Sequence, residues 1–159
     1  MIFVVLGSQK FQFNRLLKSL DESIEKGLIE EKVFAQIGSS DYKPKNYEYC
    51  DFLDRDEYKN KLVQCDVVIC HGGTGVIVGA VKNDKKVIAI ARLSRYNEHV
   101  DDHQLQIINQ FAQANMISYV NEPDEIVQKL KEIKNLSFEK YVSNQKTINK
   151  YIKEFIDSI

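Results

Sequence analysis

No apolar run of this sequence is long enough to cross a membrane. Residues 1–6 are apolar, but they are only one strand long, whereas a spanning helix needs roughly 20 residues. No basic segment precedes them, as one would in a signal peptide. We therefore expect neither a signal peptide nor a membrane anchor.

Cysteine is scarce as well, and neither sign of charge dominates. The three cysteines, Cys50, Cys65 and Cys70, lack CxxC spacing, and two of them lie in or beside apolar runs, where a free cysteine behaves as a small buried hydrophobe. The formal net charge is -1, from 22 basic and 23 acidic residues, which gives no indication of a nucleic-acid partner. This composition is typical of a globular domain in a reducing cytoplasm.

Repeats, low-complexity tracts and linkers are also absent from the 159 residues, so we expect one domain. Apolar runs predict strands over residues 2–6, 33–37, 47–53, 65–70, 87–91 and 116–120. Between them, helical patterns cover residues 13–24, 56–64, 76–81 and 100–114. The alternation predicts an α/β fold, a single Rossmann-like domain with a mainly parallel sheet and helices on both faces. Ligands of such sheets bind outside the carboxyl ends of the strands.

The last segment, residues 137–159, is predicted to be an amphipathic helix. Its apolar stripe consists of Ile148, Ile152, Phe155 and Ile159, at spacings of 4, 3 and 4. Two interpretations are open: the helix packs on its own domain, or it docks to a partner protein.

A glycine-rich turn follows the expected strand at residues 65–70. Its sequence is His71-Gly72-Gly73-Thr74-Gly75, and it opens the helix at residues 76–81. Glycines let backbone N–H groups approach a ligand closely, and a helix N-terminus adds partial positive charge, so we expect a diphosphate here. The pattern is neither GxGxxG nor a P-loop. The alternative is a tight turn without a ligand.

A second loop, Gly7-Ser8-Gln9, ends the first expected strand. Because the carboxyl ends of parallel strands meet at one edge of a sheet, we expect this loop to face the same crevice as the glycine-rich turn. The alternative is an ordinary strand-to-helix turn.

Polar residues also gather at positions 97–104, after the expected strand at 87–91. His99 and His103 lie four apart with carboxylates beside them, which superficially suits a metal ion. At the head of a helix and at the same sheet edge, Asp102, His103 and Gln104 are better suited to hydrogen-bonding the hydroxyl groups of a sugar. We therefore expect no metal site. Polar surface residues without a role are the alternative.

Taken together, these segments resemble the C-terminal domain of glycosyltransferase family 28 over nearly the whole chain. More narrowly, the chain is similar to the small catalytic subunit of split bacterial polysaccharide transferases, which act in capsule and exopolysaccharide synthesis. It is also similar to the small subunit of the eukaryotic enzyme that adds the second N-acetylglucosamine to dolichol diphosphate. The resemblance is carried by residues 5–9 with Phe13 and Leu16, by Phe52, and by residues 65–69, 71–75, 86–88 and 97–104.

The resemblance implies the C-terminal half of the two-lobed GT-B fold, the half that holds a UDP-sugar. By this likeness Phe52 lies beside the uracil, residues 72–75 lie on the diphosphate, and residues 103–104 lie near the sugar. Members often carry a glutamate after the glycine turn that holds the ribose, but the matching position here is Gly79. The residues expected to bind the nucleotide sugar are Gly7, Ser8, Gln9, Phe52, Gly72, Gly73, Thr74, Gly75, Asp102 and Gln104.

Sugar transfer from such a donor needs a stabilised leaving phosphate and a base for the acceptor hydroxyl. Backbone N–H groups, the helix dipole and either Arg92 or Arg95 are expected to stabilise the phosphate, so we expect no cofactor and no metal ion. His71 and His103 are the candidate catalytic bases, although the base can also belong to the acceptor-binding lobe. The resemblance further implies inversion at the anomeric carbon.

A polyprenyl-diphosphate-linked glycan is the acceptor that the resemblance implies. We therefore expect a membrane-anchored, acceptor-binding partner subunit that recruits this cytoplasmic chain to the inner face of the membrane. Two other functions are open: a non-catalytic module that raises the activity of a partner transferase, and a metal-dependent hydrolase built on His99, Asp102 and His103. The identity of the sugar is open as well.

Overall fold

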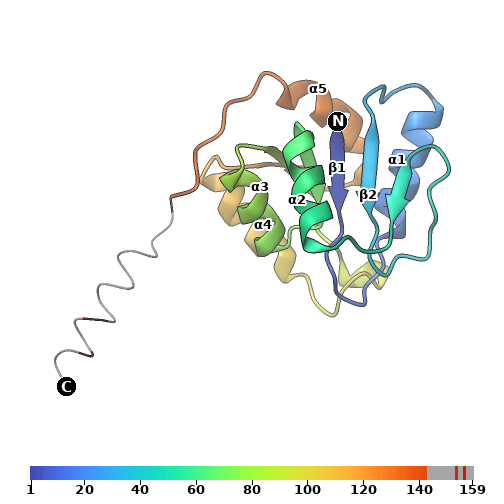
Figure 1. The fold of residues 1–159 in the computed structure, drawn as a ribbon. Helices are drawn as coiled ribbons and strands as arrows, with labels where there is room; N and C mark the ends of the chain where they lie inside the picture. The colour runs from blue at the N-terminus through green and yellow to red at the C-terminus, as the bar shows by residue number, and fades with distance from the viewer. Residues whose placement is uncertain (143–152, 154–155, 157–159) are drawn as a thin grey trace.

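Six strands form one sheet in the computed structural model, which describes residues 1–142, 153 and 156 (Figure 1). The strands are β1 (Ile2–Val5), β2 (Val33–Gln36), β3 (Glu48–Cys50), β4 (Val67–Cys70), β5 (Lys86–Ala89) and β6 (Ser118–Tyr119). Every neighbouring pair is parallel, in the order β3-β2-β1-β4-β5-β6. The predicted parallel sheet is therefore confirmed, and the strand order reverses between β1 and β4.

Four helices lie between strands, as the sequence predicts, and a fifth follows the last strand. They are α1 (Asn14–Glu25), α2 (Arg55–Gln64), α3 (Thr74–Lys82), α4 (His103–Gln113) and α5 (Ile126–Ile133), with short 3₁₀ turns at Ser94–Tyr96 and Pro123–Glu125. Local signals set their ends. Asp54 accepts hydrogen bonds from the N–H groups of Asp56 and Glu57 at the start of α2, and Gly27 follows α1 with a φ of 68°.

Helix α4 begins three residues later than the sequence predicts. Val100 is 75% exposed, so its apolar side chain adds no packing that would extend the helix. The carboxylate of Asp101 accepts a hydrogen bond from the N–H of His103 at 3.1 Å, which satisfies a first-turn N–H of the helix. Residues 100–102 therefore form the entry turn of α4.

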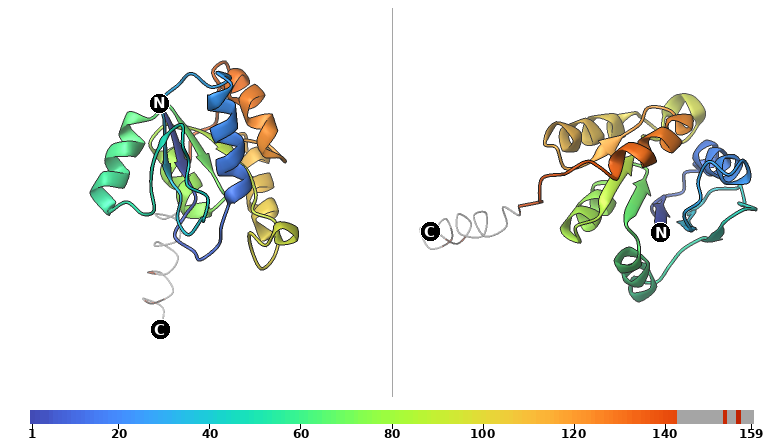
Figure 2. Two further views of the ribbon diagram at one scale, coloured as in Figure 1. Left: turned by 90° about the vertical axis from the view of Figure 1, so that its right-hand side faces the viewer. Right: turned by 90° about the horizontal axis from the view of Figure 1, so that it is seen from above.

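Alternate residues of the central strand β1 pack against opposite layers of helices. Ile2 and Val4 contact the layer that contains α1 and α5, whereas Phe3 and Val5 contact the layer that contains α2, α3 and α4. Figure 2 shows α1 and α5 on one side of the sheet and α2 and α3 on the other. The predicted helices on both faces are confirmed.

The predicted C-terminal helix lies mostly outside the described residues. Its first part, residues 137–142, has no regular secondary structure, while Phe138 and Tyr141 pack against the edge of the core. Within the described part of the chain, no helix combines the length and apolar character needed to cross a bilayer.

The core predicts a large effect of shortening Ile69 in β4, which is fully buried. Ile69→Ala should lower the free energy of unfolding by about 2–5 kcal/mol, because the site loses apolar contacts and keeps a cavity. Val63→Ala, on the exposed face of α2 at 60% exposure, should change it by less than about 0.5 kcal/mol. Urea unfolding of the two variants measures the difference, and equal losses would contradict this placement of β4.

Candidate functional site

Two loops meet where the strand order reverses, at the carboxyl ends of β1 and β4. In open parallel sheets this switch point is where ligands bind. A cavity of about 320 Å³ lies there, and we call it the switch-point cavity. Its lining residues are Gly7, Ser8, Gln9, His71, Gly73, Thr74, Gly75, Val76, His99, His103, Gln104 and Ile107. The structure thus brings together most of the residues that the sequence analysis placed at one site.

The ring of His71 fills the space between the two loops. A Cβ atom added to Gly7 would lie 2.7 Å from Cε1 of His71, and one added to Gly73 would lie 2.5 Å from Nε2. Both distances are too short for any side chain. Glycine is required at these two positions because the imidazole packs directly against the backbone of each loop.

The same ring is held in its neutral form. Nδ1 of His71 lies 3.2 Å from the carbonyl oxygen of Val5, which can only accept, so Nδ1 carries the proton. Burial, together with the positive charge of Arg92, lowers the pKa of His71 to about 4. A base this weak accepts a proton poorly at neutral pH, so the geometry favours a positioning role for His71 over the predicted catalytic one.

The N-terminus of α3 faces the switch-point cavity. Gly73 is its N-cap and Thr74 its first residue, and no acidic side chain lies in its first turn. The first N–H groups of a helix have no partner within it, and they carry the positive end of the helix dipole. A Cβ atom added to Gly75 would meet nothing within 4 Å. The turn therefore has the open backbone that an anionic group such as a diphosphate needs.

Gln104 is 3% exposed and reaches the cavity from the first turn of α4. Its amide oxygen accepts a hydrogen bond from the N–H of Arg92 at 3.0 Å. None of the hydrogen bonds formed by the described residues uses its amide nitrogen. The NH₂ group is therefore the part of Gln104 that can donate to a ligand.

Arg92, one of the two arginines expected to stabilise a leaving phosphate, is not among the residues that line the cavity. Its side chain is fully buried, and Nη2 donates to the carbonyl oxygens of Leu6 at 2.7 Å and Phe11 at 3.0 Å. These carbonyls lie at the two ends of the loop that follows β1, so the Arg92 side chain holds both ends of that loop. Its Nε and Nη1 atoms have no hydrogen-bond partner among the described residues.

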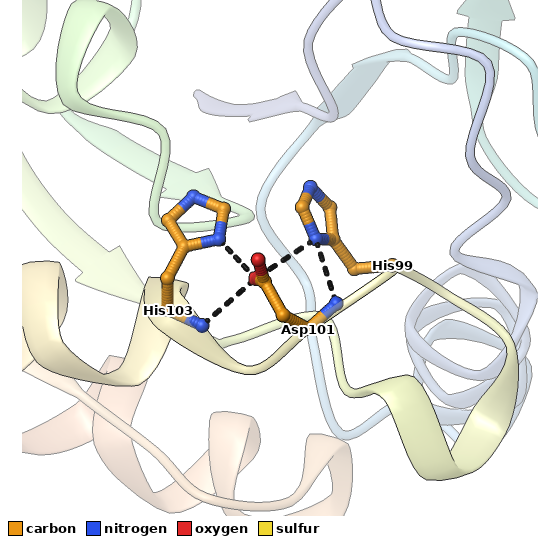
Figure 3. A group of neighbouring side chains, drawn as sticks. All are labelled: His99, Asp101 and His103. Carbon is orange, nitrogen blue, oxygen red and sulfur yellow. Dashed lines mark hydrogen bonds and ion pairs between the residues drawn. The ribbon is translucent and has the colours of Figure 1, made fainter.

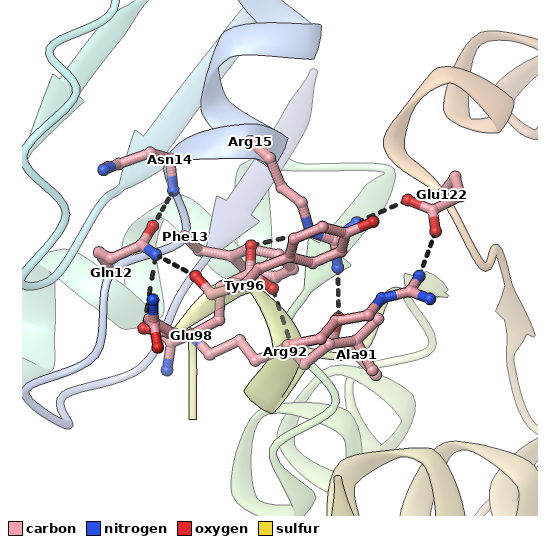
Figure 4. Close-up of polar contacts among 12 residues, drawn as sticks. Gln12, Phe13, Asn14, Arg15, Ala91, Arg92, Tyr96, Glu98 and Glu122 are labelled. Carbon is pink, nitrogen blue, oxygen red and sulfur yellow. Dashed lines mark hydrogen bonds and ion pairs between the residues drawn. The ribbon is translucent and has the colours of Figure 1, made fainter. Parts of the chain in front are cut away.

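A second arginine clamps the loop between β5 and α4. Nε of Arg15, in α1, donates to Glu98 at 2.7 Å, and Nη2 donates to the carbonyl oxygen of Ala91 at 2.8 Å (Figure 4). The other carboxylate oxygen of Glu98 accepts from the N–H of Leu93 at 3.0 Å. Burial raises the pKa of Glu98. The sequence analysis assigned Arg15 no role, since partners 83 positions apart leave no local pattern.

Arg95, the other arginine expected near the phosphate, also points elsewhere. Its Nη2 atom donates to Glu122 at 2.7 Å, a carboxylate that Arg15 shares (Figure 4). Neither arginine lines the switch-point cavity, and the expectation that one of them stabilises a leaving phosphate stays a prediction. Backbone N–H groups and the α3 dipole are the positive groups that line the cavity.

The polar residues after β5 form a cluster, but its members differ from those that the sequence analysis expected. The side chains of His99, Asp101 and His103 face one another (Figure 3), and the hydrogen bond from His103 to Asp101 lowers the pKa of that carboxyl. Asp102 instead accepts from the N–H of Ser94 at 2.7 Å and does not line the cavity. The expected grouping of His99, Asp102 and His103 is therefore wrong, because the carboxylate beside the two histidines belongs to Asp101 and not to Asp102.

Two further residues predicted to bind the donor, Phe52 and Gly72, lie outside the lining of the cavity, as does Gly79. Phe52 follows β3 and is 53% exposed. Gly72 has a φ of 80°, and a Cβ atom there would lie 2.7 Å from Cδ1 of Ile108, so this glycine allows α4 to pack closely. Gly79 has open space around its Cα atom.

A larger cavity, of about 470 Å³, lies at the opposite edge of the sheet beside Met1, Asp66 and Lys85. Its polar groups are already paired: the amino group of Met1 contacts Asp66 at 2.6 Å, and Nζ of Lys85 donates to the carbonyl oxygens at the end of α2. It also lies at the amino ends of the strands. The switch-point cavity is therefore the better candidate site.

Comparison with known proteins agrees with this choice. The glycosyltransferase family 28 C-terminal domain matches residues 1–159. The chain belongs to this family. No curated protein matches the sequence.

Solved structures of glycosyltransferases share the fold of this family 28 domain. The glycotransferase of kitacinnamycin has a TM-score of 0.60 at 16% identity, over 86% of this chain and 35% of its own. The calicheamicin glycosyltransferase CalG4 has a TM-score of 0.62 at 15% identity, over 86% and 34%. Acinetobacter baumannii MurG has a TM-score of 0.57 at 15% identity, over 83% and 41%. The predicted C-terminal half of a GT-B fold is confirmed, and the chain spans little more than a third of these proteins.

The low pKa of His71 predicts a loss of stability in acid. The folded-state pKa of about 4 lies below the value of about 6.5 in an unfolded chain. Above pH 6.5 both states are neutral and stability is complete. Between pH 6.5 and pH 4 the unfolded chain takes up the proton first, so the wild type should lose about 3 kcal/mol.

His71→Asn is the matched variant for this prediction, because the Asn amide can still donate to Val5 and does not titrate. Urea unfolding at pH 7.5 and pH 4.5 should show a smaller loss in the variant than in the wild type. Equal losses would mean that His71 is protonated in the folded state.

Proposed function

We propose that this chain is the donor-binding, catalytic part of an inverting glycosyltransferase that uses a UDP-sugar. The observation that carries the proposal is the meeting of two glycine-containing loops and the N-terminus of α3 at the switch point of a family 28 domain. The alternative reading of the glycine-rich turn, a tight turn without a ligand, does not account for the open cavity around Thr74 and Gly75.

The diphosphate of the donor is proposed to lie on the N–H groups of Thr74 and Gly75, where the dipole of α3 adds positive potential. The amide NH₂ of Gln104 and the ring of His103 then face the sugar from the far wall of the cavity. Ser8 and Gln9 lie on the wall formed by the loop after β1. These contacts need no metal ion, and we propose that transfer is metal-independent.

Transfer breaks the bond between the anomeric carbon and the diphosphate while the acceptor oxygen attacks from the opposite face. The negative charge that develops on the diphosphate is stabilised by preorganised N–H groups. The acceptor hydroxyl loses its proton to a base. Because His71 is buried and has a low pKa, we propose His103 or a group of the acceptor-binding lobe for that role.

The acceptor is proposed to be a polyprenyl-diphosphate-linked glycan, bound by a membrane-anchored partner subunit that recruits this chain from the cytoplasm. The coverage of matched transferases, 35% and 41% of their lengths, supports an acceptor-binding part outside these residues. Transfer of labelled sugar by the purified chain with washed membranes of the source organism tests the arrangement. Full activity of the chain with a soluble acceptor and no membranes would contradict it.

A graded substitution at Gly75 tests the donor site without disturbing His71. Gly75→Leu should fold normally, because its side chain enters open space, but should weaken UDP binding by about tenfold or more by crowding the diphosphate. Gly75→Ala should show a smaller effect. Calorimetric titration with UDP and UDP-sugars, in the presence of chelator and then of magnesium, measures both. Unchanged binding in Gly75→Leu would place the diphosphate elsewhere.

One observation favours the second candidate, a non-catalytic module that raises the activity of a partner. The nucleoside side of the site is sparse, since Phe52 lies outside the cavity lining and Gly79 stands where relatives of this family often carry a ribose-binding glutamate. Such a module binds its partner but not UDP. Absence of UDP binding by both the chain and its complex would select this function.

The open space at Gly79 allows a gain-of-binding test. Gly79→Glu should tighten UDP binding by about tenfold, since a hydrogen bond to a charged group contributes about 1.5–3 kcal/mol. Gly79→Ala, which changes only the helix, should leave UDP affinity unchanged. Calorimetry with UDP and with the ribose-free ligand diphosphate distinguishes a ribose contact, which affects UDP alone, from a general change of the helix.

A further inference from the structure

Two imidazoles and a carboxylate converge beside the switch-point cavity. One potential ligand atom from each of His99, Asp101 and His103 lies within 4.8 Å of the others, and Figure 3 shows both rings turned toward the Asp101 carboxylate. Nδ1 of His99 lies 3.3 Å from Oδ1 of Asp101, and Nδ1 of His103 contacts the same oxygen. Asp101 lies in the entry turn of α4, His99 precedes that turn, and His103 is the first residue of the helix.

The hydrogen bonds of His99 show which of its nitrogens could bind a cation. Nε2 lies 3.3 Å from the amide oxygen of Gln9, an acceptor, so Nε2 carries the proton. Nδ1 carries none, and its one lone pair accepts only a long hydrogen bond, 3.4 Å, from the N–H of Asp101. A cation that replaced this long contact would lie between Nδ1 and the carboxylate oxygen of Asp101, which are 3.3 Å apart. A metal-binding histidine usually donates its second N–H to a carbonyl in this way.

The distance between these two atoms also fits a metal ion. Zinc binds imidazole nitrogen and carboxylate oxygen at about 2.0–2.2 Å, so its tetrahedral ligands lie about 3.3 Å apart. His99 is held rigidly, because its side chain is 6% exposed and its ring lies 4.6 Å from that of Phe11. Asp101 and His103 are about half exposed, so they are accessible from solvent and free to adjust to an ion.

We propose that His99, Asp101 and His103 form a binding site for a divalent transition metal, with zinc as the fitting ion. Two imidazoles and one carboxylate suit zinc, nickel or copper, whereas magnesium and calcium require oxygen ligands. Three protein ligands leave the fourth position of a tetrahedral ion for water or another ligand. This inference replaces the sequence-based expectation of no metal site, which assigned Asp102, His103 and Gln104 to the hydroxyl groups of a sugar. It is independent of the diphosphate site proposed at Thr74 and Gly75. The ion would replace the proton that Nδ1 of His103 shares with Asp101, so with the ion bound the catalytic base is a group of the acceptor-binding lobe.

The test is calorimetric titration of the chain, without a histidine tag, with Zn²⁺, together with the visible absorption of Co²⁺ as a probe of the ligand geometry. We expect one Zn²⁺ per chain and no heat with Mg²⁺. Asp101→Asn and His103→Gln, both at exposed positions, should weaken Zn²⁺ binding at least about tenfold, since even loss of an outer-shell partner has an effect of that size. Their unfolding midpoints should match the wild type.

Two control variants complete the design. Asp102→Asn removes the neighbouring carboxylate outside the cluster and should leave the Zn²⁺ affinity and the Co²⁺ spectrum unchanged. Cys50→Ser removes a partly exposed thiol, another potential zinc ligand, and should also have no effect. Absence of Zn²⁺ binding, or equal affinity in all four variants, would overturn the proposal. UDP titration in chelator tests the donor site separately, so the failure of one proposal leaves the other standing.

Discussion

The contact between the His71 ring and the backbones of Gly7 and Gly73 sets the width of the switch-point cavity. The ring is anchored to β1 through the carbonyl of Val5 although it belongs to the turn after β4. It therefore fixes the two loops relative to each other as well as to the sheet. The neutral state of the ring follows from the same placement, because a buried imidazole beside a buried guanidinium does not take up a second proton at neutral pH. The buried position of the His71 ring therefore determines both the spacing of the two loops and the protonation state of the ring.

Two arginines extend this arrangement to the third loop of the site. Arg92 binds the loop after β1 through two carbonyls while its own backbone is bound by Gln104. Arg15 connects α1 to Glu98 and Ala91. The three loops around the cavity are thus linked by hydrogen bonds between groups far apart in the sequence. A ligand would meet a site whose walls are already positioned, which lowers the ordering cost of binding.

Periodicity was sufficient to predict the fold. The apolar runs and the helical spacing placed the strands and most helices correctly, and their alternation implied the parallel sheet, because local patterns decide local structure. The positions of Gly7, Thr74 and Gln104 at one edge followed from that topology. These sequence patterns did not predict the direction in which each side chain points. Whether Asp101 or Asp102 faces His103 depends on the turn before α4, where Asn97 has a φ of 55°, and a one-residue shift exchanges the two carboxylates.

The order of the strands also bears on how the site comes into being. Ile2 pairs with Val67, so β1 and β4 meet only after a chain segment of more than sixty residues has been closed into a loop. Long-range parallel pairing of this kind is slow to form. Neither half of the cavity exists in a fragment that lacks the other strand. The cavity is also lined by His103 and Gln104 of α4, so it is complete only after α3 and α4 have both packed on the sheet.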